Sequence, residues 1–177
     1  MKIRMLGTGY GECKIKKKTL KDYRHRGGVL VDEKILIDAP SDIFEVADEL
    51  GFSDMFDKVS DVIISHSHEG HFSLDSITKL AERRSIRIYA TGKVLDLIPD
   101  SASVEKIKLS TSQPVMIDDY TLYSLPANHI TEIKGEMCLN FVLLRDKALL
   151  YALDGGGINF NSWKTLSQLK LDAVIID

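Results

Sequence analysis

The sequence predicts a single α/β domain whose sheets are covered by helices on their outer faces. Three observations indicate this class. Short apolar runs typical of buried strands alternate with segments of helical spacing in the N-terminal part of the chain. In the C-terminal part, strand follows strand across polar turns before one more helix appears. The 177 residues are 44% hydrophobic and 28% charged, which suits one globular domain spanning residues 1–177.

The predicted strands of the N-terminal part are short and apolar. The first is closed by Gly7-Thr8-Gly9, where glycine permits turns that other residues resist. The second and third are expected to pair around the polar Asp32-Glu33 turn. The strands of this part are Lys2–Leu6, Val29–Val31, Lys34–Ile37, Asp61–Ser65 and Arg87–Ala90.

Three helices are predicted among these strands. In the first, apolar residues recur at helical spacing from Ile43 to Leu50, and Gly51 stands where a C-terminal cap is expected. The second begins after Ser73, whose hydroxyl can cap the first turn. The third is short and covers Gly92–Ile98. The expected apolar face of the second helix consists of Leu74, Ile77, Leu80 and Ala81.

From residue 103 onward the pattern is mainly β. Polar residues such as Asp119 supply turns between neighbouring strands. Helical spacing returns over Asn161–Leu169, and "DAVIID" (Asp172–Asp177) is one more buried strand. The strands before that helix are Val104–Leu109, Val115–Ile117, Thr121–Leu125, Met137–Leu144 and Ala148–Leu153.

Composition and charge exclude several classes of protein. No run of about 18 apolar residues occurs, so we expect no membrane-spanning helix. The N-terminus lacks the apolar region of a signal peptide, and Cys13 and Cys138 make neither a disulfide framework nor a CxxC metal motif. We therefore expect a cytoplasmic protein. The net charge of −3 gives no overall attraction to nucleic acid, although the expected surface loop within Lys14–Arg26 holds seven Lys or Arg residues against one acid, Asp22.

Histidines are crowded in "SHSHEGHF" (Ser65–Phe72), which follows a predicted strand. Neutral imidazole is the commonest side-chain ligand of transition metals. His66 and His68 are two positions apart, so they can point the same way at the end of an extended segment. His71 comes after the turn at Gly70 and can face a neighbouring metal. A polar surface loop or satisfied core histidines stay open as alternatives, but the crowding favours a metal site.

These residues resemble a known family. "HSHEGHF" is similar to the HxHxDH signature of the metallo-β-lactamase superfamily, which includes glyoxalase II, the 3′ tRNA-processing endoribonuclease and the cyclic phosphodiesterases of phosphonate breakdown. The segments "MLGTG", "LIDAP", "PANHI", "YALDGGG" and "LDAVIID" resemble further family positions in the same order. "GTG" followed by a long loop is most similar to the phosphodiesterase branch. The resemblance implies a metallo-β-lactamase-like αβ/βα sandwich of two mixed sheets with outer helices.

The resemblance also implies roles for single residues. The first metal, zinc or manganese, would be held by His66, His68 and His129. His71 and Asp154 would belong to a second metal, with Asp154 shared between both, and these two residues are also the ones expected to act in catalysis. Asp38 would orient a ligand or the metal loop by hydrogen bonding, although a plain turn residue is an alternative.

Two departures from the family pattern weaken the second site. Gly70 stands at the position of the family's aspartate and has no side chain with which to bind a metal. Glu69 is an adjacent carboxylate and an alternative ligand, but neighbouring side chains tend to point apart. The family's last histidine would lie beyond Asp177, so either the chain is a truncated product or it lacks that ligand and the closing elements. We therefore expect one tightly bound metal and a weakened second site.

These residues predict a metal-dependent hydrolase, with a phosphodiesterase as the leading hypothesis. A metal-bound hydroxide would attack the phosphorus. Lys14–Arg26 would attract a small anionic substrate such as a nucleotide or a cyclic phosphate, and a solvated loop with no partner is the alternative for this segment. A thioester or lactam hydrolase and a degenerate, non-catalytic binding module are the alternatives. Nucleic acid is a further alternative partner, supported by nothing beyond the basic segment. A homodimer also stays open, because an apolar strand edge invites pairing.

Overall fold

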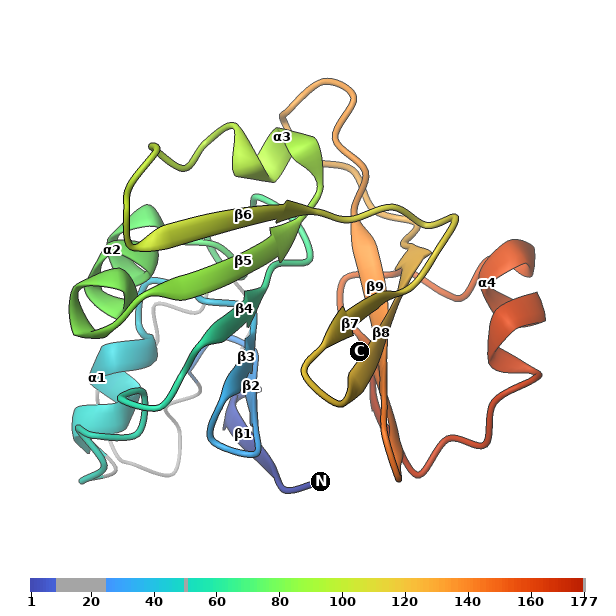
Figure 1. Cartoon of the computed structure of the whole chain (residues 1–177). Helices are drawn as coiled ribbons and strands as arrows, with labels where there is room; N and C mark the ends of the chain where they lie inside the picture. The colour runs from blue at the N-terminus through green and yellow to red at the C-terminus, as the bar shows by residue number, and fades with distance from the viewer. Residues whose placement is uncertain (9–24, 50, 177) are drawn as a thin grey trace, which may run out of the picture.

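The chain folds into two β-sheets packed face to face, with helices on their outer faces (Figure 1). The computed structural model describes residues 1–8, 25–49 and 51–176. Each sheet contains both parallel and antiparallel strand pairs. The predicted sandwich of two mixed sheets with outer helices is therefore confirmed.

The first sheet has six strands, and its spatial order follows the sequence. The strands are β1 (Ile3–Gly7), β2 (Gly28–Val31), β3 (Ile35–Ile37), β4 (Asp61–Ile63), β5 (Ile86–Ala90) and β6 (Val104–Lys108). β1, β2 and β3 pair antiparallel, whereas β3 to β6 pair in parallel. The segments that follow β3 and β4 begin at Asp38 and Ile64. They therefore start side by side at the same end of this sheet.

The second sheet has five strands. In spatial order they are β11 (Ala173–Ile176), β10 (Ala148–Ala152), β9 (Leu139–Leu144), β8 (Tyr120–Pro126) and β7 (Val115–Ile117). β8 and β10 both pair antiparallel with β9, so they run in the same direction. The segments after β8 and after β10 consequently start at the same end of the sheet. β11 pairs in parallel with β10 and is an edge strand on which Val174 and Ile176 are exposed.

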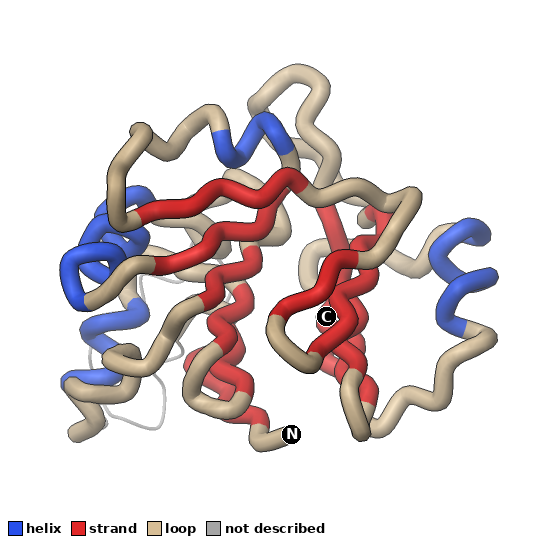
Figure 2. The backbone as a smooth tube through the Cα atoms, viewed as in Figure 1, coloured by secondary structure: helices blue, strands red, loops and turns tan. Residues whose placement is uncertain are grey.

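Helices flank the sandwich on both outer sides (Figure 2). α1 (Ile43–Glu49) and α2 (Leu74–Arg83) lie against the six-stranded sheet, and the short α3 (Gly92–Leu95) follows β5. α4 (Phe160–Leu166) lies beside the five-stranded sheet. Each predicted helix is present, with ends that differ from the expected ones by a few residues.

The helix α2 shows both a confirmed cap and an incorrect assignment. Ser73 is its N-cap, and the Ser73 side chain accepts a hydrogen bond from the backbone N–H of Ser76. Leu74, predicted to lie on the apolar face, is 40% exposed, whereas Ser76 is fully buried. The reason is that the Ser76 hydroxyl donates to the Pro40 carbonyl at 2.7 Å, so a polar residue takes part in the buried face.

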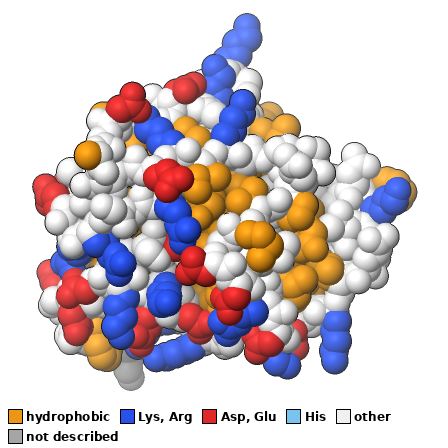
Figure 3. All heavy atoms as spheres, in the orientation of Figure 1, with side chains coloured by type: hydrophobic (Ala, Val, Ile, Leu, Met, Phe, Trp, Pro, Cys, Tyr) orange, Lys and Arg blue, Asp and Glu red, His pale blue; other side chains and the backbone are white. Residues whose placement is uncertain are grey.

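The core consists of three apolar layers, which explains why the central strands are apolar throughout. Along β3 and β4, alternate side chains point to opposite faces. Leu36 and Val62 pack under the helices of the first sheet, while Ile35, Ile37 and Ile63 pack against the second sheet. A third layer lies between the five-stranded sheet and α4. On the face shown in Figure 3, hydrophobic side chains gather between regions rich in charged ones.

Several expectations concern residues that the structure treats differently or does not describe. The predicted surface loop over Lys14–Arg26 lies outside the described residues except for His25 and Arg26, and Cys13 lies outside them too. The strand that begins at Asp61 ends at Ile63, two residues earlier than expected. No described helix is long and apolar enough to cross a membrane.

Candidate metal site

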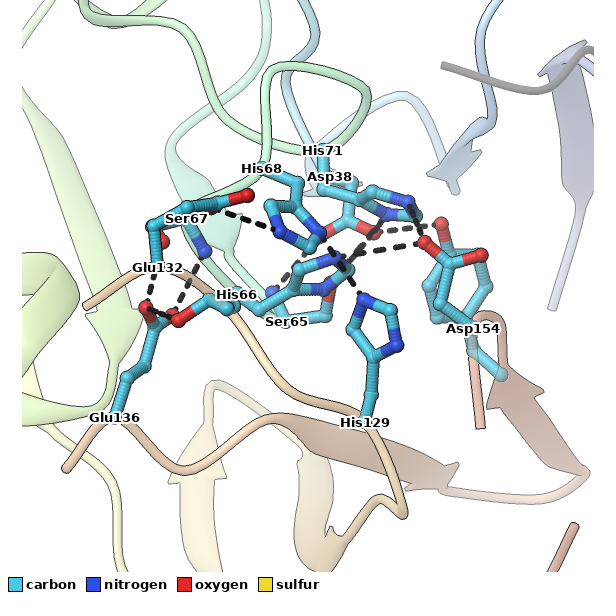
Figure 4. Close-up of polar contacts among 12 residues, drawn as sticks. Asp38, Ser65, His66, Ser67, His68, His71, His129, Glu132, Glu136 and Asp154 are labelled. Atoms are coloured by element: carbon cyan, nitrogen blue, oxygen red, sulfur yellow. Dashed lines mark hydrogen bonds and ion pairs between the residues drawn. The ribbon is translucent and has the colours of Figure 1, made fainter. Parts of the chain in front are cut away.

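Four segments from the two sheets converge at one end of the sandwich (Figure 4). Asp38 follows β3, and the histidine motif follows β4 in the first sheet. In the second sheet, His129 lies in the loop after β8, and Asp154 follows β10. Because each of these strands points to the same end, their carboxyl-terminal loops meet there, as is common for sites at strand ends.

The three histidines of the predicted first site lie together. His129 Nε2 is 3.0 Å from His68 Nδ1, and the ring of His66 lies 4.9 Å from each of the other two rings, between centroids. Single ligand atoms of His66, His68, His129 and Asp154 all lie within 4.8 Å of one another. This group of four could hold a metal ion. The structure thus brings together residues that are separated by as many as 88 positions.

The free ring nitrogen of His66 points into this group. His66 is buried, and its Nε2 has no hydrogen-bond partner among the described residues, although Asp154 Oδ2 lies 3.5 Å away. A buried nitrogen without a partner is costly unless another group binds it. The chemistry of the four donors and this orphaned nitrogen both fit a metal ion.

A short chain of hydrogen bonds fixes which nitrogen of His66 is free. The Ser65 hydroxyl lies 3.0 Å from Asp38 Oδ2 and 3.0 Å from His66 Nδ1. The Asp38 carboxylate can only accept, so the hydroxyl donates to it and accepts from the Nδ1–H of His66. His66 then carries its proton on Nδ1 and presents the lone pair of Nε2 to the group of four.

Asp38 is the buried acceptor at the centre of this arrangement. Its Oδ2 lies 2.7 Å from His71 Nδ1 and 2.8 Å from the Tyr151 hydroxyl, and its Oδ1 accepts from the Ser65 backbone N–H at 2.8 Å. Asp38 is fully buried and has a left-handed backbone with φ of 60°. Aspartate tolerates this conformation better than most residues. These contacts are those expected of a residue that orients the histidine segment.

His71 joins the two carboxylates. Its Nδ1 pairs with Asp38, and its Nε2 lies 2.8 Å from Asp154 Oδ2. Burial acts to lower the pKa of His71, but Asp38 and Asp154 outweigh it and raise the pKa to about 10. His71 lies outside the group of four whose ligand atoms converge. In the described structure it is an ion-pair partner of Asp154.

The other candidate groups differ in charge state. The nearby imidazoles of His66 and His71 hold the pKa of Asp154 well below its usual range, so this side chain is a carboxylate at neutral pH. Burial and the neighbouring His66 and His68 lower the pKa of His129, which favours its neutral form. Neutral imidazoles and an ionised carboxylate are the forms that bind metal.

The glycines after Asp154 permit close packing. Asp154, Gly156 and Gly157 all have positive φ values, of 56°, 54° and 126°. A Cβ atom on Gly155 would lie 3.4 Å from Asn140 Nδ2, tighter than most such contacts. The glycine run therefore lets the backbone turn sharply beside the second sheet and directs Asp154 toward the histidines.

The structure does not bring Glu69 to the histidines. Its carboxylate lies 3.0 Å from Arg26 Nη2, and its side chain is 74% exposed. The neighbouring turn does not use the conformational freedom of glycine, because the φ of Gly70 is not positive. Instead, the backbone N–H groups of His71 and Phe72 both donate to the His68 carbonyl at 2.8 Å.

Sequence reasoning missed two glutamates that touch the histidine segment. Glu132 Oε2 lies 3.1 Å from His68 Nε2, and Glu136 accepts two hydrogen bonds from Ser67. The available signal was their position, since both follow His129 by seven residues or fewer. It was weak, because exposed glutamates are common in loops.

No protein-family model matches the sequence, and no curated protein matches it. Solved structures do match. A metallo-β-lactamase fold protein, YhfI from Bacillus subtilis, has a TM-score of 0.69 at 16% identity, covering 97% of this chain and 68% of its own. A diphosphatase from the PhnP family has a TM-score of 0.73 at 19% identity, covering 97% of this chain and 72% of its own. A metallo-β-lactamase from Cronobacter sakazakii has a TM-score of 0.58 at 16% identity, covering 85% of this chain and 71% of its own.

These likenesses establish the fold. The chain has the metallo-β-lactamase fold, as the resemblance in its sequence implied. A fold can host many reactions, so the reaction has to be argued from the site.

Proposed function

We propose that this protein is a metal-dependent hydrolase and that its substrate is a phosphodiester. The observation that carries the proposal is the group of His66, His68, His129 and Asp154, with the buried, unpartnered Nε2 of His66 pointing into it. Three imidazoles with one carboxylate suit zinc, and manganese is the second candidate. A bound divalent metal supplies a water of lowered pKa and stabilises negative charge that develops on the substrate.

The residues of the site have separable tasks. His66, His68 and His129 would hold the first metal. Asp154 would be a further ligand and would accept a hydrogen bond from the attacking water. Asp38 and Ser65 hold the ring of His66 in the required tautomer. His71 would join Asp154 at a second, weaker metal position, where it first has to lose the proton that its two carboxylate partners favour.

The likeness to a PhnP-family diphosphatase supports phosphate chemistry. Its TM-score of 0.73 compares with 0.58 for the Cronobacter sakazakii lactamase. The basic segment that begins at Lys14 also suits an anionic substrate, such as a nucleotide or a cyclic phosphate.

The test is hydrolysis of a chromogenic phosphodiester, compared with a thioester and a lactam, each with added zinc or manganese. We expect metal-dependent cleavage of the phosphodiester and its loss in His66→Ala and Asp154→Asn. Faster cleavage of the thioester or the lactam would show that the phosphodiester is not the preferred substrate class. Bound metal with no cleavage of any of them would favour a binding module.

A further inference from the structure

The loop that carries His129 also contacts the segment that carries His66 and His68. This loop, the His129 loop, comprises residues 127–138 between β8 and β9. Besides His129, it contributes two carboxylates that reach across to the segment Ser65–His68. The two segments come from different sheets, so these contacts join the two halves of the site (Figure 4).

Glu136 connects the backbone of the histidine motif to the His129 loop. Its Oε1 accepts from the backbone N–H of Ser67 at 2.8 Å, and its Oε2 accepts from the Ser67 hydroxyl at 2.6 Å. The same Oε2 accepts from the Thr131 hydroxyl at 2.7 Å. Ser67 lies between two histidines of the motif, and Thr131 lies two residues after His129. One carboxylate thus sets the distance between the histidine-bearing segments.

Glu132 determines the orientation of a single ring. Its Oε2 lies 3.1 Å from His68 Nε2, while His68 Nδ1 faces His129 Nε2. A glutamate carboxylate accepts hydrogen bonds, so this contact favours the His68 tautomer that carries its proton on Nε2. The lone pair of His68 Nδ1 then points toward the other ligands.

We propose that Glu132 and Glu136 are positioning residues that preorganise the three-histidine metal site from the His129 loop. The inference rests on the proposed metal-dependent function. Glu136 fixes the distance between the two segments, and Glu132 fixes the tautomer and direction of His68. Such partners of ligands commonly change metal affinity by about 10- to 100-fold when removed.

The test is zinc affinity, measured by competition with a chromophoric chelator. We expect Glu136→Ala and Glu132→Ala each to raise the zinc dissociation constant about 10- to 100-fold. Glu136→Gln and Glu132→Gln keep an oxygen acceptor without the charge, so they should recover most of the affinity. Glu82→Ala is the matched control, because Glu82 is exposed on α2, and it should leave the affinity unchanged.

A spectroscopic measurement separates positioning from a general loss of folding. In the cobalt-substituted protein, the d–d absorption reports the coordination of the metal, and we expect it to change in both alanine variants. In the zinc-loaded native chain, nitrogen-15 chemical shifts should place the proton of His68 on Nε2. Melting curves without metal show whether each variant folds.

The outcomes distinguish this proposal from the one on which it rests. A native chain that binds no zinc or manganese overturns the proposed function. A native chain that binds zinc, with both alanine variants binding it equally well, overturns only the positioning role. Glutamine variants as weak as the alanine variants would indicate that net charge, and not hydrogen bonding, sets the affinity, which also overturns it. A proton on His68 Nδ1 would exclude the role of Glu132.

Discussion

The two ends of the sandwich differ in whether their polar side chains are paired with one another. At the histidine end, imidazoles from both sheets converge, and His66 Nε2 has no hydrogen-bond partner among the described residues. At the other end, which we call the clasp, Asp32, Tyr120 and Arg145 join the two sheets. Asp32 Oδ2 accepts from the Tyr120 hydroxyl and lies 3.2 Å from Arg145 Nη2. The Arg145 guanidinium also lies over the Tyr120 ring, 4.5 Å from its centroid.

The same three strands connect the clasp with the histidine end. β3, β8 and β10 each run from the clasp toward the histidine end, because Asp32, Tyr120 and Arg145 precede or begin them. Asp38, His129 and Asp154 follow the same three strands. The clasp is a set of satisfied contacts that stabilises the fold. The histidine end instead brings together a group of side chains that could hold a metal ion.

The largest expected effect is on the histidine end. At a free zinc concentration about 1,000 times the dissociation constant, zinc should raise the free energy of unfolding by about 4 kcal/mol. His66→Ala should weaken binding at least about 100-fold, which removes about 2.7 kcal/mol of that gain. Denaturant unfolding with and without zinc measures this. An equal zinc effect in both proteins would exclude His66 as a ligand.

The next effect concerns the second metal position. Gly70→Asp adds a carboxylate close to His71 and should increase the affinity for a second metal at least tenfold, because anionic oxygens offset the repulsion between two cations. Gly70→Asn has nearly the same shape without the charge and is the control. Metal content at matched zinc or manganese concentrations measures the change. Two tightly bound metals in the native chain would show that the second site is already complete.

A smaller effect is expected at the clasp. Tyr120→Phe removes one hydrogen bond to an ionised acceptor and should lower the free energy of unfolding by about 1 kcal/mol. The zinc affinity should not change, because the clasp lies at the opposite end of β8. Tyr123→Phe, on the same strand, is the control and should have little effect. A change in zinc affinity with Tyr120→Phe would show that the two ends are coupled.

The smallest effect is the response of the clasp to acid. Burial acts to raise the pKa of Asp32, but hydrogen bonds from Tyr120 and the backbone of Lys2 and the charge of Arg145 lower it overall. A lowered folded-state pKa gives stability that is present above the unfolded pKa of about 4 and is lost as the pH falls through the folded value. The contribution should be below about 1 kcal/mol, because Asp32 is partly exposed and screened. Asp32→Asn should make the free energy of unfolding fall less steeply as the pH is lowered below about 4. Denaturant unfolding at several acid pH values measures this slope, and an unchanged slope would contradict the prediction.

The parts of the fold that could be predicted are those that depend on local pattern. The strands and the helix caps follow from apolar runs and capping residues, as with Ser73. Leu74 was assigned wrongly because helical spacing does not reveal that Ser76 can be buried through the Pro40 carbonyl. The strand ending at Ile63 was also predicted too long. Local pattern gives elements, whereas tertiary contacts decide their ends and the exact buried face.

The candidate site divides in the same way. His66, His68 and His71 could be suggested from their spacing alone, because they follow one strand. The meeting of His129 with them depends on two strands from different sheets running to one end, so it was expected only from the family resemblance. Glu132 and Glu136 could not be predicted, because their roles depend on contacts across the two sheets.

The His129 loop has a closed base and a turn at its tip. Pro126 and Leu139 are paired in the sheet, and the Ala127 N–H donates to the Cys138 carbonyl at 2.9 Å. The tip is the turn from Ile133 to Glu136, with Gly135 at a φ of 80°. Glu132 and Glu136 anchor the loop on either side of this turn, so residues 133–135 can be exchanged while both anchors stay in place. Because loop-closure entropy grows slowly with length, even doubling the loop would cost only about 0.6 kcal/mol. Residues 133–135 are therefore the part of the loop whose length and sequence could change while Glu132 and Glu136 keep their contacts with the histidine segment.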